Sequence, residues 1–125
     1  MNPISDNLKV GSNTIITQKI GNEKVYFSCL VKKHSKKLYS NIIDRIFFIT
    51  NVSIYKFKAN EPKKLMKLNE IKAVTISEKS YEFIIHGNQE AYDHLFISLE
   101  RKNILEALHT HYYNITKQDL LLYIN

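Results

Sequence analysis

The feature that most constrains the fold is an alternating run of apolar and polar side chains over residues 25–57, VYFSCLVKKHSKKLYSNIIDRIFFITNVSIYKF. A period of two places every second side chain on the same face of a strand. The run divides into three segments, residues 25–32, 42–50 and 53–58, and almost no linker separates the last two. Because a parallel pair needs a crossover of a dozen or more residues, we expect neighbouring antiparallel strands.

Four further strands are expected downstream. A polar loop over residues 59–64, in which Pro62 ends the third strand, leads into a short edge strand at 65–68. Alternation resumes at residues 71–77, 81–86 and 92–97, and the turn sequence Gly87-Asn88-Gln89 favours a hairpin between the last two. The sequence therefore predicts seven strands.

The period changes after the seventh strand. Ile104, Leu105, Leu108 and Tyr112 recur at helical spacing, and Ser98 is a suitable capping residue, which predicts a helix over residues 99–113. The apolar tail at 119–124 is expected to pack back as a short strand or extended segment. Seven strands followed by one helix predict a mostly β protein, a twisted antiparallel sheet or partly closed barrel plugged at one end by the helix.

The length of 125 residues, with 44% apolar, favours a single domain. Residues 1–22 contain Gly11, Gly21 and several polar residues, and we expect a mobile N-terminal arm that packs only one short segment against the domain. The domain itself is predicted over residues 23–125.

The expected location is intracellular. Neither an apolar run of about 20 residues nor the pattern of a signal peptide occurs in the sequence. The lone Cys29 cannot form an internal disulfide and fits a reducing compartment. Its alternation with Phe27 and Val31 predicts a small buried side chain and no nucleophilic role.

The distribution of charge is more informative than the net charge of +6. Residues 24–72 hold twelve basic residues against three acidic ones, whereas residues 73–125 hold four basic residues against seven acidic ones. This polarity suits a docking face for an anionic partner such as a membrane surface or a nucleic acid.

The densest positive charge lies between the first two strands. Residues 32–37 contain four lysines, and other lysines lie on neighbouring connections: the full set is Lys32, Lys33, Lys36, Lys37, Lys56, Lys58, Lys63 and Lys64. A solvated hairpin loop with no function is the alternative interpretation. The loop lysines and the lysines on the neighbouring connections are expected at the same end of the fold. Together they favour a binding surface for anionic lipid head groups.

Three sequence stretches resemble a known family when taken in order. They are DRIFFITN followed by IYKF at residues 44–57, LNEIKAVTIS at 68–77, and EFIIH at 82–86. Their order and spacing are similar to the tail homology 1 region of class I myosins, and the similarity covers about residues 24–125.

The resemblance implies a pleckstrin-homology fold, with seven strands in two near-orthogonal sheets and a capping C-terminal helix. It implies binding of anionic phospholipids, including phosphoinositides, by a cytoskeletal protein at the inner face of membranes. The first-strand basic residue of the family falls on Lys33, or on Lys32 if the register differs by one. The second-strand residue falls on Arg45, and Lys36 and Lys37 occupy the loop between them.

A protein-interaction module on the same scaffold is the alternative function. The position two before Arg45, which is basic in the pleckstrin-type lipid motif, is Ile43, and Asp44 adds a negative charge. Nucleic-acid binding ranks third because the one predicted helix lies in the acidic half. No motif for an enzyme, cofactor or metal was found, and His109 and His111 point different ways on a helix.

Overall fold

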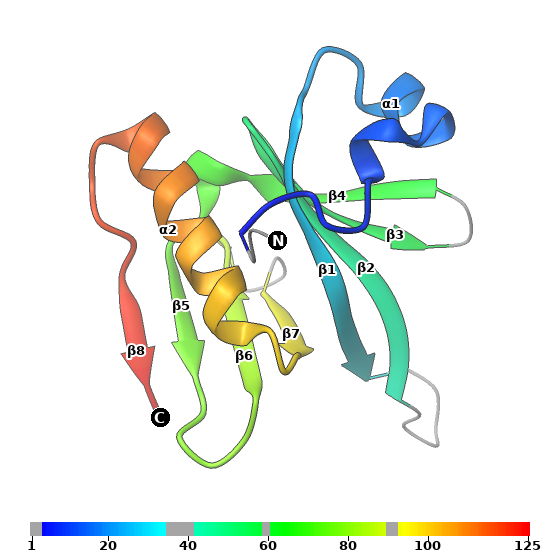
Figure 1. Cartoon of the computed structure of the whole chain (residues 1–125). Coiled ribbons are helices and arrows are strands. Elements are labelled where there is room, and N and C mark those ends of the chain that lie inside the picture. The colour runs from blue at the N-terminus through cyan, green and yellow to red at the C-terminus, as the bar shows by residue number, and fades with distance from the viewer. Residues whose placement is uncertain (1–3, 35–41, 59–60, 90–92) are drawn as a thin grey trace.

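A computed structural model describes residues 4–34, 42–58, 61–89 and 93–125 (Figure 1). The strands are β1 Val25–His34, β2 Ile42–Thr50, β3 Ser53–Lys58, β4 Glu61–Lys67, β5 Ala73–Ile76, β6 Glu82–His86, β7 His94–Ile97 and β8 Leu122–Ile124. The helices are α1 Thr14–Ile20 and α2 Arg101–Thr116, and the short 3₁₀ turns are η1 Val10–Ser12 and η2 Leu68–Glu70.

The strands form one sheet in the order β4-β3-β2-β1-β7-β6-β5-β8. All neighbouring strands are antiparallel except β5 and β8, which are parallel. β1 and β2 pair along almost their whole length, whereas β1 and β7 meet in a single registered pair, Lys32 opposite Ile97. Figure 1 shows how the two halves of the sheet, β1–β4 and β5–β8, diverge from this junction.

The mostly β class, the C-terminal helix and the C-terminal strand agree with the sequence prediction, but the two near-orthogonal sheets of a barrel are not confirmed. The described strands make a single open sheet whose edges are β4 and β8. The N-terminal segment lies along the part of β1 that has no registered pair with β7. Asp6 forms a parallel bridge with Ser28, and the Ser28 amide donates to the Ser5 carbonyl at 3.3 Å.

The main core lies between the sheet and α2. Ile104, Ala107 and Leu108 of α2 are buried against strand residues that include Phe27, Phe47, Phe83, Ile85 and Phe96. The helix begins two residues later than predicted and ends three residues later, at Thr116. Ser98 does not cap it at the expected boundary: its hydroxyl accepts from the Glu100 amide and donates to the Leu30 carbonyl of β1. The residue therefore ties the start of α2 to the β1–β7 junction.

A second buried cluster covers the other face of β2 and β3. Val10, Ile16 and Ile20 pack there against Phe48 and Tyr55. The Asn13 side chain caps α1 by accepting from the Ile16 amide at 3.1 Å. The described part of the segment expected to be an arm, residues 4–22, thus contributes to a core, and its mobility stays a prediction.

Pro62 does not end the third strand as predicted. β4 begins at Glu61, and Pro62 lies within it, opposite Phe57 of β3. Proline lacks an amide hydrogen and is tolerated where a strand forms the edge of a sheet. The position of β4 at the edge explains why the ladder continues through this residue.

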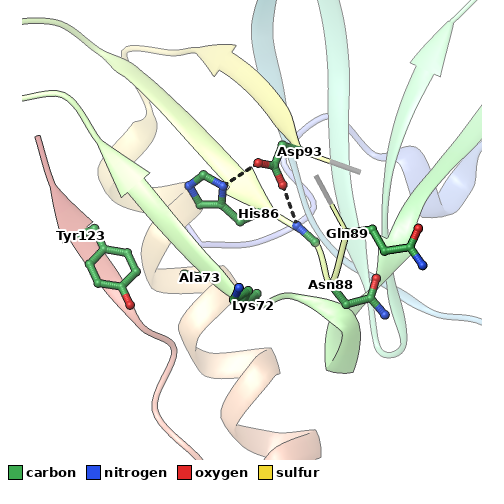
Figure 2. A pocket seen from close by; sticks show the side chains of 8 residues that line it. Lys72, Ala73, His86, Asn88, Gln89, Asp93 and Tyr123 are labelled. Atoms are coloured by element: carbon green, nitrogen blue, oxygen red, sulfur yellow. Dashed lines mark hydrogen bonds and ion pairs between the residues drawn. The ribbon is translucent and has the colours of Figure 1, made fainter. Parts of the chain in front are cut away.

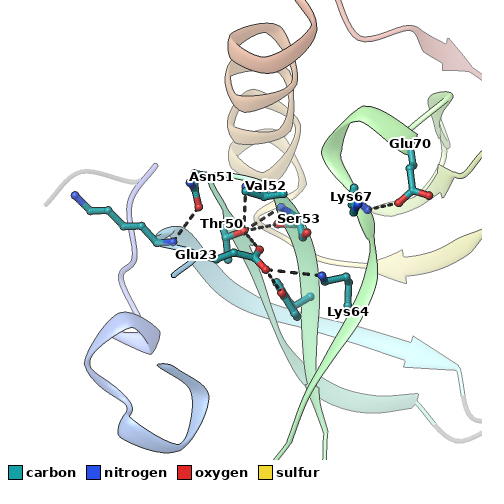
Figure 3. A network of polar contacts seen from close by, with 10 residues as sticks. Glu23, Thr50, Asn51, Val52, Ser53, Lys64, Lys67 and Glu70 are labelled. Carbon is teal, nitrogen blue, oxygen red and sulfur yellow. Dashed lines mark hydrogen bonds and ion pairs between the residues drawn. The ribbon is translucent and has the colours of Figure 1, made fainter. Parts of the chain in front are cut away.

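A polar network fastens the turn between β2 and β3 (Figure 3). The Thr50 hydroxyl donates to Glu23 Oε1 at 2.6 Å and accepts from the amides of Val52 and Ser53 at 3.1 and 2.9 Å. The Tyr55 hydroxyl donates to the other Glu23 oxygen at 2.6 Å. Burial, followed by this bond, raises the pKa of Tyr55, so the phenol stays protonated. The network links Glu23, two residues before β1, to the β2–β3 hairpin.

Candidate functional site

The basic end of the β1–β2 hairpin is the first candidate site. The register places Arg45 opposite Val31 and Ile43 opposite Lys33. Because side chains alternate along a strand, Lys33 and Arg45 lie on the same face, at diagonal positions where side chains are about 7–8 Å apart. Both residues are half-buried, so this face presents two cations from adjacent strands.

The guanidinium of Arg45 is only partly hydrogen-bonded. Its Nη1 donates to the Asp44 carbonyl at 2.9 Å, while its Nε is buried and has no hydrogen-bond partner among the described residues. An unpaired buried donor is unfavourable, and an oxyanion that accepts from it removes the penalty. The planar guanidinium suits the oxygens of a phosphate group.

Lys32 lies on the opposite face of β1 and is paired with Asp44 of β2. Its Nζ is 3.9 Å from Asp44 Oδ1, and both side chains are largely exposed. Exposed pairs of this kind contribute little to stability. The electrostatic effect is local: Asp44 offsets part of the positive charge of Lys32 but lies on the other face from Lys33.

The remaining predicted residues divide into two groups. Lys56 of β3 pairs with Phe47, which places it on the face of Arg45 at another diagonal position. Lys36 and Lys37 lie in residues 35–41, outside the described part of the chain. The structure therefore gathers Lys33, Arg45 and Lys56 on one face and separates Lys32 from them.

A second site, missed in the sequence, surrounds His86 at the start of the β6–β7 connection (Figure 2). His86 Nδ1 lies 2.8 Å from Asp93 Oδ2, its Nε2 lies 2.7 Å from the Thr75 hydroxyl, and the Gly87 amide donates to Asp93 Oδ1 at 3.2 Å. The surrounding pocket of about 460 Å³ includes Lys72 and Tyr123. His86 and Asp93 flank the predicted Gly87-Asn88-Gln89 turn, which is the signal that could have suggested the pair.

The bonds around His86 explain a structural role. Both ring nitrogens already have partners within the protein, and the two Asp93 oxygens connect the end of β6 to the residue before β7.

The other singled-out side chains have structural partners. Cys29 is buried, and burial raises its pKa, which disfavours the thiolate. His109 lies 3.0 Å from Asp119, and His111 stacks on Tyr26. Among residues 4–34, 42–58, 61–89 and 93–125, no group of three or more His, Cys, Asp or Glu side chains is placed to hold a metal ion. None of the helices in this part of the chain is long and apolar enough to cross a membrane.

Comparison of the whole structure with solved structures shows the fold. The hSac2 domain from human phosphoinositide phosphatase Sac2 is similar, with a TM-score of 0.66 over 83% of this chain and 79% of that chain. The sequence identity is 15%. The likeness is therefore one of fold alone.

The sequence comparisons identify the family. No curated protein matches the chain at a significant level. A family model does match, over residues 4–125, and it describes the tail of unconventional myosins as actin- and lipid-binding. The match begins ahead of η1 and so includes the N-terminal segment that packs against β2 and β3. The chain therefore belongs to the unconventional myosin tail family, tail homology 1, which binds lipid and actin.

Proposed function

We propose that this chain is a peripheral membrane-binding module that attaches to anionic phospholipids, including phosphoinositides, at the cytoplasmic face of membranes. The observation that carries the proposal is the placement of Lys33 and Arg45 on one face at the end of the β1–β2 hairpin. The description of the family as lipid-binding supports the same class of partner.

The two cations have different roles in this proposal. Arg45 binds a phosphate group through its guanidinium, whose planar array of N–H donors matches phosphate oxygens. Lys33 supplies a compact positive charge from the neighbouring strand, and Lys56 adds a third cation on the same face. The sequence adds Lys36 and Lys37 between β1 and β2, outside the described residues.

The expected attachment is weak and reversible. Each lysine near an anionic leaflet contributes about 1 kcal/mol. Four or five together therefore raise the membrane partition coefficient by roughly three orders of magnitude. Surface potentials of this kind fall off within a Debye length of about 8 Å at physiological salt. Stable recruitment needs a second attachment, such as a partner protein or apolar insertion.

The test compares two double charge reversals with the same change in net charge. Lys33→Glu/Arg45→Glu removes the proposed site, whereas Lys9→Glu/Lys117→Glu changes two exposed lysines. Lys9 precedes η1 and Lys117 follows α2, and these helix ends lie away from the β1–β2 end in Figure 1. Co-sedimentation with phosphatidylserine vesicles should fall at least about tenfold in the first variant.

The control variant should keep most of the binding, and both should melt close to the wild-type temperature. Equal losses in the two variants would mean that net charge alone drives attachment. Unchanged binding by Lys33→Glu/Arg45→Glu would place the lipid site elsewhere.

A protein-interaction role is the second candidate. Ile43, at the position where the lipid motif has a basic residue, favours it, as does the description of the family as actin-binding. The same two variants should be tested for co-sedimentation with actin filaments. Filament binding that survives in Lys33→Glu/Arg45→Glu, together with loss of vesicle binding, would assign actin to a different surface.

A further inference from the structure

An open apolar groove of about 770 Å³ lies at the junction of β1 and β7. Leu30 and Lys32 of β1 form one wall, and Tyr81, Ile97 and Leu99 form the other. The register places Leu30 and Lys32 on the face of β1 opposite the main core. The groove is therefore a surface feature, distinct from the face that carries Lys33 and Arg45.

The apolar side chains of this groove project into solvent. Leu99 is 82% exposed, Leu30 is 54% exposed and Tyr81 is 53% exposed. Scattered single apolar residues are ordinary on protein surfaces, but a contiguous exposed group marks an interaction site. These three side chains come from β1, the β5–β6 turn and the β7–α2 junction, so folding brings them together from separate parts of the chain.

Hydrogen bonds hold the projecting residues in place. Nη1 of Arg101 donates to the carbonyls of Ser77, Ser80 and Glu82 at 3.0, 2.8 and 2.9 Å, and the guanidinium lies 5.9 Å from the centre of the Tyr81 ring. This anchors the turn that carries Tyr81. On the other side of Leu99, Ser98 bonds to the Leu30 carbonyl at 3.0 Å. The group is thus presented on a fixed frame.

The groove lies next to the proposed lipid-binding end. Lys32 lines it, and Lys33 follows on the other face of the same strand. Figure 1 shows the β5–β6 turn, the end of β1 and the start of β2 in the lower part of the molecule, with the start of α2 above the turn. The end of β1 therefore carries the basic face on one side and the apolar group on the other, within a few residues of each other along the strand.

We propose that Leu30, Tyr81 and Leu99 insert into the interfacial layer of an anionic bilayer when the basic hairpin attaches. This inference rests on the proposed function and supplies the second attachment that electrostatic binding lacks. Asp44 and Glu100 also line the groove, and Lys32 lies 3.9 Å from Asp44. The attraction to the membrane therefore comes from the hairpin cations, and the groove adds apolar contact.

The geometry favours a membrane over a peptide strand as the occupant. A peptide that adds to a sheet needs an open strand edge. Here the Leu30 carbonyl already accepts from Ser98, and Lys32 is already paired with Ile97. Leu99, at 82% exposure, also projects from the groove into solvent. Protruding leucine and tyrosine side chains suit the boundary between head groups and acyl chains.

The test uses tryptophan as a reporter, because the sequence contains no tryptophan. Leu99→Trp places the fluorophore at the proposed insertion point, and Ile124→Trp places it at a residue of β8 that is 63% exposed. Phosphatidylserine vesicles with and without brominated acyl chains are added. Trp at position 99 should shift to the blue and be quenched by the brominated lipid, while Trp at position 124 should do neither.

Co-sedimentation of the same samples separates this inference from the proposed function. A Leu99→Trp protein that sediments with vesicles but shows neither shift nor quenching would overturn insertion and leave electrostatic binding intact. Failure of every variant and of the wild type to sediment would overturn both. A shift produced by actin filaments but not by vesicles would assign the groove to a protein partner and also overturn the inference.

A second pair of variants tests the contribution to affinity. Leu99→Gln should weaken vesicle binding about tenfold and make the remainder more sensitive to salt, because the apolar contact is lost. Ile124→Gln should leave binding unchanged. Equal binding by the two variants would contradict the proposal.

Discussion

Tyr26 of β1 and His111 of α2 stack with their ring centroids 5.0 Å apart and their planes at 17°. Burial of His111 lowers its pKa below the ordinary value of 6.5, because the charged imidazolium is penalised. The unfolded chain therefore binds a proton more readily than the folded chain. The contribution of His111 to the unfolding free energy is therefore fully present above pH 6.5. It is lost as the pH falls through 6.5 toward the lower pKa of the folded state.

The His111→Phe variant keeps an aromatic ring and removes the titration. Between about pH 7.5 and about pH 5, the wild type should lose more unfolding free energy than this variant. Urea denaturation at a series of pH values measures the difference. Identical pH profiles would show that His111 is as easily protonated in the folded state as in the unfolded chain.

Thr50 is expected to be important for the β2–β3 turn. Thr50→Val keeps the shape of the side chain but leaves the amides of Val52 and Ser53, and the partly buried Glu23 carboxylate, without the hydroxyl. We expect a loss of about 1–3 kcal/mol in unfolding free energy. Thr110→Val, at an exposed position on α2, is the control and should change stability little. Equal stabilities of the two variants would show that the network of Figure 3 contributes nothing.

The N-terminal helix offers a matched pair of neighbouring residues. Ile16 is 1% exposed in the cluster with Phe48 and Tyr55, whereas Ile15 is 51% exposed. Ile16→Ala should cost about 2–5 kcal/mol of unfolding free energy, and Ile15→Ala should stay within about 0.5 kcal/mol of the wild type. If Ile16→Ala is as stable as Ile15→Ala, α1 detaches in solution and the mobile-arm prediction holds.

The sequence predicts strand positions well where one face is buried. The alternation of Phe27, Cys29 and Val31 corresponds to residues of the main core in β1. Alternation did not predict what covers β2. The run Ile46-Phe47-Phe48-Ile49 is apolar on both faces, so it does not distinguish a core face from a solvent face. Such a run is typical of a strand buried on both sides, and the second cover is α1.

Long-range relationships explain the remaining differences. Neither the parallel pairing of β8 with β5 nor the single registered pair between β1 and β7 depends on local pattern, so periodicity cannot predict them. The apolar group of Leu30, Tyr81 and Leu99 is likewise assembled from three distant segments. In contrast, the shared face of Lys33 and Arg45 follows from strand alternation once the hairpin register is known.

The measurement that tests the central proposal most directly is co-sedimentation with three kinds of liposome at low and physiological salt. The vesicles contain neutral lipid alone, phosphatidylserine, or phosphoinositide at the same surface charge as phosphatidylserine. A site formed around Lys33 and Arg45 predicts preference for phosphoinositide that persists when salt shortens the Debye length to about 8 Å. Binding that follows charge alone and disappears with salt would contradict a formed phosphoinositide site, and no binding to any liposome would contradict the membrane-binding role itself.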